Sequence, residues 1–310
     1  MVHIKNLVKR YGELVALDHL NLDIREGEIF GLLGPNGSGK TTAINCILAL
    51  LKYDKGSITV MEKEMHPDSY ELKRQIGVVP QNVAVFDQMN VQANIDYFCG
   101  LYVTEKEKRK QLVEEAIEFV GLQDYRKMMP GKLSGGLLRR LNIACGIAHK
   151  PKLIIMDEPT VAVDPQSRNR ILEGILELNR QGSTIIYTSH YMEEVEQICS
   201  RIMIMDHGRE IATGTSDELK QMIKTGETIH ISGIELAQEN LDIIGRLPHV
   251  FWTDYDAEKT LTVKCTAGKH NLIRILNYLQ EQEIEFGQVT SELPTLNDVF
   301  LEITGKELRD

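Results

Sequence analysis

The distribution of apolar residues along positions 1–224 is that of an α/β protein. Short, almost wholly apolar runs, such as residues 28–33 and 153–156, predict strands that are buried on both faces of a sheet. Residues 91–102 and 105–120 instead repeat apolar positions at helical spacing. Buried strands that alternate with amphipathic helices predict a mostly parallel sheet covered by helices.

Residues 226–310 follow a different pattern, in which short segments give the order βαββαβ. The expected strands are 228–232, 250–255, 260–265 and 284–290, the expected helices are 236–247 and 269–282, and a final helix is expected at 296–304. This order predicts a small α+β unit of the ferredoxin-like kind. We therefore expect two domains, residues 1–224 and 225–310.

A glycine-rich loop follows the first apolar run and precedes a predicted helix at 43–51. It matches G-x-x-x-x-G-K-[ST] at every fixed position and consists of Gly34, Pro35, Asn36, Gly37, Ser38, Gly39, Lys40, Thr41 and Thr42. Glycines let backbone N–H groups close on an anion, and the helix N-terminus favours negative charge. In such a loop Lys40 binds the β- and γ-phosphates, and Thr41 offers its hydroxyl to Mg²⁺.

Polar residues stand at the ends of three other predicted strands. Gln81 ends the strand at 76–81, Asp157 and Glu158 follow the run at 153–156, and His190 ends the strand at 183–190. Carboxyl ends of parallel strands meet at one edge of a sheet, where ligands bind. Asp157 would hold Mg²⁺, Glu158 would polarise a water, and His190 would donate to a phosphate oxygen. Helix-capping acids and an ordinary core histidine are the alternatives.

Two further features are ambiguous in the residues alone. Tyr11, ahead of the loop, is a candidate for stacking on adenine, although its position alone favours an ordinary turn residue. Ser134, Gly135 and Gly136 open a helix that runs to His149. They form either a second anion-binding helix end or a plain N-cap.

Composition narrows the class of protein. The chain of 310 residues has a net charge of −10, and residues 225–310 hold 15 acidic but only 7 basic side chains. This balance argues against a nucleic-acid surface. The five cysteines are scattered without a C-x-x-C pair, which fits a reducing compartment and no metal site. No run of 18 apolar residues and no signal-peptide pattern is present.

Over about residues 1–220 these separated motifs resemble the ATP-binding subunit of an ATP-binding-cassette (ABC) transporter. The resemblance implies that Tyr11 stacks on adenine, that residues 34–42 bind the phosphates, and that Gln81 contacts magnesium and faces the membrane partner. It implies that Asp157 binds magnesium, Glu158 is the catalytic base and His190 is the switch histidine. It further implies that Asp164 lies at the dimer interface, and that the γ-phosphate held by the opposing subunit is bound by Ser134, Gly135 and Gly136. It also implies a RecA-like core with an antiparallel β subdomain and an α-helical signature subdomain.

One position departs from the family pattern. The signature usually ends in glutamine, whereas here Leu137 stands at that position and cannot form side-chain hydrogen bonds. We expect the ATP sandwich to survive, because the Ser134 hydroxyl and the glycine amides remain. This variant resembles that of type-2 exporters, and residues 294–305 resemble the ending of bacterial multidrug and antibiotic-resistance exporter ATPases, such as those for daunorubicin, bacitracin or linearmycin.

The resemblance implies an ATPase that uses ATP and Mg²⁺, dimerises with a second copy and powers export through a separate membrane permease. It places the chain in the cytoplasm, peripheral to the inner face of the membrane, with no nucleic-acid partner. The domain at 225–310 would serve dimerisation or regulation, or only stability. The alternatives are a non-transport cassette ATPase, an importer subunit and a nucleotide-binding regulator that does not hydrolyse ATP.

Overall fold

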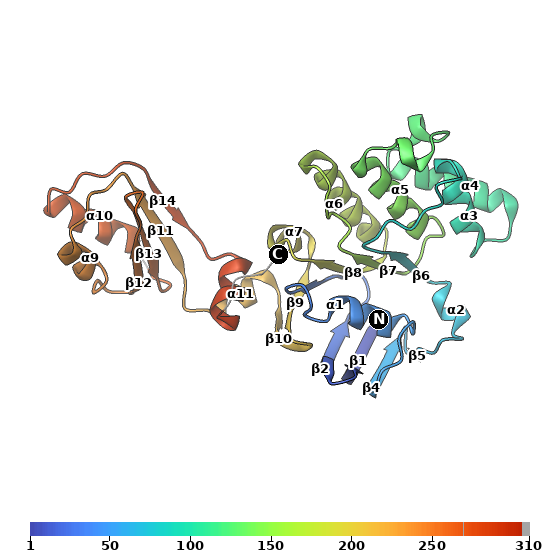
Figure 1. The fold of residues 1–310 in the computed structure, drawn as a ribbon, viewed down its shortest axis with the longest axis horizontal. Helices are drawn as coiled ribbons and strands as arrows, with labels where there is room; N and C mark the ends of the chain where they lie inside the picture. The colour runs from blue at the N-terminus through green and yellow to red at the C-terminus, as the bar shows by residue number, and fades with distance from the viewer. Residues whose placement is uncertain (269, 306–310) are drawn as a thin grey trace. The chain divides into compact units, whose positions relative to one another are not determined.

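The computed structural model describes residues 1–268 and 270–305, and the chain forms two compact units (Figure 1). The first unit covers Met1–Thr215, and the second begins at Ser216. Helix α8 (Ser216–Gln221) belongs to the second unit because it packs against α11 (Leu296–Thr304). The predicted boundary after residue 224 therefore lies within the second unit as the contacts define it.

A six-stranded sheet forms the centre of the first unit, in the order β10-β9-β3-β8-β7-β6. Its strands are β3 (Ile29–Leu33), β6 (Ile76–Val79), β7 (Leu153–Asp157), β8 (Thr184–Ser189), β9 (Arg201–Asp206) and β10 (Arg209–Gly214). All neighbours pair in parallel except β10, which is antiparallel to β9. Every residue of β3, β7 and β8 is buried, which explains the apolar runs that these strands contain.

A second, antiparallel sheet has the order β2-β1-β4-β5. Its strands are β1 (Val2–Tyr11), β2 (Leu14–Ile24), β4 (Lys55–Val60) and β5 (Lys63–Glu64). Helix α1 (Lys40–Ile47) lies between the two sheets in Figure 1. One apolar core joins all three layers, with Ala43 and Ile47 of α1 packed among side chains of both sheets.

Helices cover the rest of the first unit. They are α2 (Tyr70–Lys73), α3 (Val91–Gly100), α4 (Lys106–Phe119), α5 (Gly135–Ile147), α6 (Pro165–Arg180) and α7 (Met192–Ile198), with short 3₁₀ turns η1 (Gln123–Tyr125) and η2 (Pro130–Lys132). Figure 1 shows α3, α4 and α5 gathered together beside β6, where α5 packs on that strand. This is the α/β fold with an antiparallel β subdomain and a helical subdomain that the sequence predicted.

The second unit is built on an antiparallel sheet of order β12-β13-β11-β14. Its elements besides α8 and α11 are β11 (Glu227–Ser232), α9 (Gln238–Ile244), β12 (Val250–Tyr255), β13 (Thr260–Cys265), α10 (Asn271–Glu281) and β14 (Val289–Glu292). Side chains from this sheet and from α9 and α10 form a separate apolar core. The βαββαβ order agrees with the pattern in the sequence. Lys269, the predicted first residue of α10, and residues 306–310 lie outside the described residues.

Two predicted element boundaries differ from the structure by four residues or more. Helix α1 ends at Ile47 rather than at Leu51, because Ala49 adopts a left-handed backbone with φ of 50°. The last strand of the sheet spans Val289–Glu292 rather than 284–290. Ile284 instead closes the end of α10, where its N–H donates to the Leu279 carbonyl.

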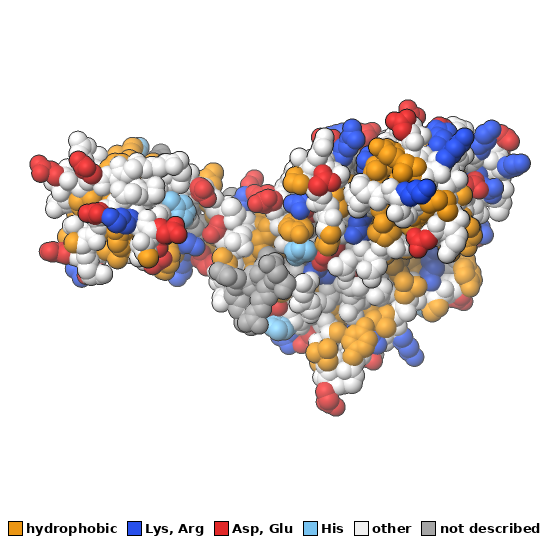
Figure 2. Space-filling view, turned by 45° about the horizontal axis from the view of Figure 1, so that its top comes forward, with side chains coloured by type: hydrophobic (Ala, Val, Ile, Leu, Met, Phe, Trp, Pro, Cys, Tyr) orange, Lys and Arg blue, Asp and Glu red, His pale blue; other side chains and the backbone are white. Residues whose placement is uncertain are grey.

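The surface of the first unit is chemically mixed. On the face drawn in Figure 2, basic, acidic and hydrophobic side chains are interspersed over this unit. Among the described residues, no helix combines the length and the apolar character needed to cross a membrane.

Candidate functional site

The loop between β3 and α1 wraps around the buried side chain of Lys40. Its Nζ donates to the Gly34 carbonyl at 2.7 Å and to the Pro35 carbonyl at 3.2 Å. Burial lowers the pKa of Lys40, while the charges of Glu158 and Asp157 act in the opposite direction. The loop thus holds a desolvated cation against the start of a helix.

Glycine is required at two positions of this loop for different reasons. A Cβ on Gly34 would lie 2.3 Å from the Met205 carbonyl oxygen, so no side chain fits there. Gly39 has φ of 106°, a conformation that other residues rarely adopt, and a Cβ would meet the Ala16 carbonyl at 2.8 Å. The phosphate loop can therefore pack closely against β2 and β9 only because glycine stands at both positions.

Asp157, the last residue of β7, lies beside the loop and is buried. Its Oδ2 accepts a hydrogen bond from the Thr41 hydroxyl at 3.0 Å, and its Oδ1 accepts one from the Thr188 hydroxyl at 2.6 Å. A carboxylate and a hydroxyl from two separate elements thus converge at the start of α1. Hard oxygen ligands of this kind suit Mg²⁺.

The Glu158 carboxylate lies at the centre of the site. Its Oε1 is 3.8 Å from Lys40 Nζ, and its Oε2 is 3.4 Å from Gln81 Nε2 and 3.1 Å from His190 Nδ1. Glu158 has φ of 47°, and its N–H donates to the Thr188 hydroxyl at 3.0 Å. The structure therefore brings together residues from four strand ends or loops that are far apart in the sequence.

A cavity of about 290 Å³ opens beside the phosphate loop. It is lined by Tyr11, Leu14, Val15, Ala16, Asn36, Gly37, Ser38, Gly39, Lys40, Thr41, Thr42, Gln81, Glu158 and His207. The Tyr11 side chain is 48% exposed, and Lys9 Nζ lies 5.0 Å from its ring centroid. Tyr11 thus presents an open aromatic surface at the mouth of this cavity.

Ser134, Gly135, Gly136 and Asp164 lie elsewhere and do not line this cavity. Ser134 caps α5, where its hydroxyl accepts the Leu137 N–H at 3.3 Å, and Asp164 caps α6 through the Ser167 N–H at 2.9 Å. The two caps are neighbours, since a Cβ on Gly136 would lie 3.2 Å from Asp164 Oδ2. Within one chain, the predicted site residues therefore form two groups.

The cavity fits a nucleotide phosphate group and Mg²⁺. The Ser38 hydroxyl is buried without a hydrogen-bond partner, and the first amides of α1 have no partner within the helix. The paired oxygens of Thr41 and Asp157 suit a hard cation. Among the described residues no cluster of three His, Cys, Asp or Glu side chains could hold a metal by itself. Phosphate oxygens or water would have to complete the coordination of Mg²⁺.

The sequence did not reveal three residues that support this site. Thr188 joins Asp157 to the backbone of Glu158, and Arg139 donates to the Gln81 carbonyl at 2.7 Å. His207 lines the cavity from the turn after β9. Thr188 had one signal, because it precedes His190 by two residues in the same strand run.

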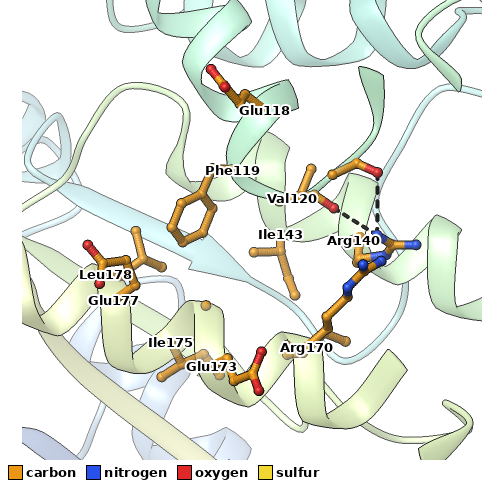
Figure 3. Close-up of a pocket in the computed structure, with 13 residues that line it drawn as sticks. Glu118, Phe119, Val120, Arg140, Ile143, Arg170, Glu173, Ile175, Glu177 and Leu178 are labelled. Atoms are coloured by element: carbon orange, nitrogen blue, oxygen red, sulfur yellow. Dashed lines mark hydrogen bonds between the residues drawn. The ribbon is translucent and has the colours of Figure 1, made fainter. Parts of the chain in front are cut away.

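A second cavity of about 380 Å³ lies between α4, α5 and α6 (Figure 3). Phe119 and Ile143 line it, and Arg140 donates to the Val120 and Gly121 carbonyls at its edge. Its charged lining residues are of both signs, Arg140 and Arg170 against Glu118, Glu173 and Glu177. None of the predicted site residues lines this cavity.

The fold and the site together define a P-loop nucleotide-binding cassette, and comparison with known proteins specifies its family. Residues 17–161 match the model of the ABC transporter family. The chain is 37% identical over its whole length to the linearmycin resistance ATP-binding protein LnrL of Bacillus subtilis (strain 168), of which it covers 100%. It is 33% identical to the daunorubicin resistance ATP-binding protein DrrA3 of Streptomyces coeruleorubidus, with 97% of this chain and 95% of the relative aligned.

Solved structures agree with this result. A dimeric structure of MJ0796, a bacterial ABC transporter cassette, superimposes with a TM-score of 0.64 at 28% identity, covering 69% of this chain and 98% of that one. A post-hydrolysis dimer of the same cassette bound to ADP and phosphate gives the same values. The chain belongs to the ABC transporter family, and it is a nucleotide-binding ATPase subunit of the exporter group.

Proposed function

We propose that the cluster around Glu158 is the hydrolytic site for Mg²⁺-ATP. The observation that carries this proposal is the convergence of Lys40, Gln81 and His190 on one buried carboxylate. Lys40 and the amides of the phosphate loop bind the β- and γ-phosphates. Glu158 orients and polarises the attacking water, as a carboxylate placed beside a γ-phosphate does. His190 and Gln81 fix the position of that carboxylate and sense the γ-phosphate.

The paired oxygens of Thr41 and Asp157, with the Gln81 side chain, would hold a magnesium ion. Mg²⁺, when bound there, neutralises charge that develops on the phosphates. Thr188 keeps the Asp157 carboxylate turned toward Thr41, because it donates to the other carboxylate oxygen. Tyr11, exposed at the cavity mouth, stacks on the adenine ring.

A second copy of the chain completes each site. Ser134, Gly135 and Gly136 form a helix start rich in N–H donors, yet they do not line the cavity of their own chain. Facing the cavity of a partner copy, these residues bind the γ-phosphate there and supply positive charge at the helix end. Leucine at position 137 leaves the backbone part of this arrangement intact, because the Leu137 N–H donates to the Ser134 hydroxyl. Asp164, next to Gly136, lies at the same interface.

The permease contacts the segment after Gln81, as part of a complex on the inner face of the membrane. The exposed ring of Phe86 packs against Tyr97 and Phe98, with ring centroids 4.9 and 5.8 Å apart. Buried Asn94 fixes the segment, because its side chain accepts the Phe86 N–H and donates to the Phe86 and Met89 carbonyls. An exposed aromatic group in the segment that follows Gln81 suits contact with a partner protein.

The cargo is a drug, an antibiotic or a lipid-like molecule. The names of LnrL and DrrA3 refer to linearmycin and daunorubicin resistance, and a relative of 32% identity from Sinorhizobium fredii is a Nod factor export ATP-binding protein. The second unit, predicted as an accessory domain at 225–310, serves dimerisation or regulation. Copurification of the full chain with a membrane protein tests the permease assignment.

Replacement of Glu158 by glutamine tests the hydrolytic assignment directly. Glutamine keeps the size of the side chain but cannot act as a base, so ATP turnover falls about 10²–10⁴-fold. ATP binding remains, because Lys40 and the phosphate loop are unchanged. Phosphate release and fluorescent-nucleotide titration measure the two properties.

Lys40→Ala is the matched control, since it removes the cation of the cradle and lowers nucleotide affinity itself. Turnover of Glu158→Gln close to that of the natural chain would exclude Glu158 as the base. Natural affinity in Lys40→Ala would argue against the cradle.

A further inference from the structure

A buried carboxylate is bonded to residues close in sequence to Glu158 and His190, and the scheme above gives it no role. Glu194 is in the first turn of α7, and only 3% of it is exposed. A buried carboxylate is costly unless several donors satisfy it. The donors that surround it therefore indicate what it holds in place.

Three hydroxyl groups donate to one oxygen of this carboxylate. Glu194 Oε2 accepts hydrogen bonds from Tyr187 at 2.6 Å, Thr160 at 2.7 Å and Ser189 at 3.1 Å. All three donor residues are buried. Burial, and then the adjacent Glu194 charge, raise the pKa of Tyr187 well above its usual value, so its phenol stays protonated and donates.

The other carboxylate oxygen faces a cation. Arg168 Nε of α6 lies 3.2 Å from Glu194 Oε1, as an ion pair without hydrogen-bond geometry. The Arg168 guanidinium also lies over the Tyr191 ring, 4.7 Å from its centroid, and that ring is 4.1 Å from the His190 ring. Glu194 is thus linked to His190 indirectly, through Arg168 and then Tyr191.

The hydroxyl donors belong to the two segments that carry Glu158 and His190. Thr160 follows Glu158 by two residues, and its carbonyl accepts the Val163 N–H at 3.3 Å. Ser189 precedes His190, and its hydroxyl also accepts the Tyr191 N–H at 2.9 Å. Through Thr160 and Ser189, one carboxylate joins the loop after Glu158 to the backbone on both sides of His190.

The loop after β7 needs such a support. Glu158 and Ala162 both adopt left-handed backbone conformations, with φ of 47° and 59°. Residues other than glycine keep such conformations only where their surroundings hold them. Thr188 holds the N–H of Glu158, and the Glu194 carboxylate holds Thr160, which lies between the two strained residues.

We propose that Glu194 is a positioning residue for ATP hydrolysis, which sets the distance between Glu158 and His190 through Thr160, Ser189 and Tyr187. This inference rests on the proposed roles of Glu158 and His190. Glu194 itself has no place in nucleotide binding, because neither it nor its hydroxyl donors line the cavity of the phosphate loop.

Glu194→Gln in the full-length chain tests the proposal. Glutamine retains the size of the side chain, but its uncharged amide cannot accept three hydroxyl groups as the carboxylate does. We expect kcat to fall at least about tenfold, which corresponds to 1.36 kcal/mol of barrier. The KM for ATP and the nucleotide affinity should remain within about twofold, which separates a loss of positioning from a loss of binding.

Glu193→Gln is the matched control, since Glu193 is exposed in the same helical turn. It should behave as the natural chain does. Tyr187→Phe provides a second variant that keeps the buried ring and removes one donor. It should lower kcat by a smaller factor, and it should have less effect in the Glu194→Gln background than alone, because both changes act on one network.

Unchanged kcat in a folded Glu194→Gln chain would overturn the proposal. So would a parallel loss of kcat, nucleotide affinity and thermal stability in both Glu194→Gln and Tyr187→Phe, because that result marks a purely structural residue. If Glu194→Gln does not fold, unchanged kcat in Tyr187→Phe overturns it equally. Failure of the hydrolytic assignment is recognised separately, since Glu158→Gln would then retain turnover.

Discussion

At the scale of single residues, the site contains buried groups of opposite charge that compensate one another. Lys40 and Glu158 are both nearly inaccessible, with side chains 5% and 7% exposed. Removing one partner of such a pair leaves the other charge buried without compensation. A nucleotide in the proposed site would supply further negative charge beside Lys40, so we expect phosphate binding and the position of Glu158 to be coupled through that lysine.

A half-buried histidine outside the site gives a pH dependence of folding. Burial lowers the pKa of His149 to about 4. Its Nε2 donates to the Ile76 carbonyl at 3.2 Å, its buried Nδ1 has no partner, and its ring stacks on Tyr102 at 3.9 Å. Protonation would place an unpaired N–H in this apolar contact. The folded chain therefore disfavours the charged form.

The sign follows from the two pKa values. The unfolded chain binds the proton near pH 6.5 and the folded chain only near pH 4, so stability is lost as pH falls through that interval. Between pH 7.5 and 5.5 this residue should lower the free energy of unfolding by about 1 kcal/mol. His149→Phe should lose that part of the pH dependence, as measured by urea unfolding followed by circular dichroism.

His66→Phe is the control, because His66 is exposed and should leave the pH dependence unchanged. The prediction fails if the natural chain and His149→Phe lose stability in parallel over this interval.

Sequence patterns indicated the candidate residues that would contact phosphate or metal, but not the residues that hold those candidates in place. Lys40, Thr41, Asp157 and Glu158 lie in local patterns whose spacing alone indicates phosphate and metal binding. Thr188 and Glu194 do not, because their importance comes from contacts with segments 30 or more residues away. A threonine in a buried strand and a glutamate in a charged helix turn are otherwise unremarkable in sequence.

At the scale of elements, buried strands were predictable and helix ends were less so. Strands β3, β7 and β8 contain apolar runs because both faces are covered, and this signal is local. The end of α1 depends on the left-handed conformation of Ala49, which alanine itself does not indicate. The place of β14 depends on its pairing with β11, a contact between distant segments.

The start of α5 provides a test of the two-chain site. Ser134→Arg places a long, positively charged side chain at the start of α5, where the nucleotide of the second copy is proposed to bind. The change also removes the Ser134 hydroxyl. The ATP-dependent dimer should be lost, while nucleotide binding to the single chain stays within about twofold, because Ser134 does not line its own cavity. Sedimentation and nucleotide titration measure these two properties.

Gln111→Arg is the control, since Gln111 is exposed on α4 and the change adds the same charge. A normal ATP-dependent dimer of Ser134→Arg would refute the placement of α5 against a partner's nucleotide.

At the scale of the whole molecule, we propose that the chain contributes two separate halves to one catalytic arrangement. The phosphate loop, Asp157 and Glu158 would form one half, and the caps of α5 and α6 would form the other. A single copy does not bring these halves to one cavity. Two copies related by symmetry would use both halves twice, as a self-complementary interface does. Binding of ATP would then stabilise the dimer until the γ-phosphate is removed.

The measurement that tests this account most directly is the mass of full-length Glu158→Gln by light scattering, with and without ATP and Mg²⁺. Because this variant binds ATP and does not hydrolyse it, the account predicts a monomer without nucleotide and a stable dimer with it. Ser134→Arg in the same background should remain monomeric. A Glu158→Gln chain that binds ATP and stays monomeric at all concentrations would contradict the account.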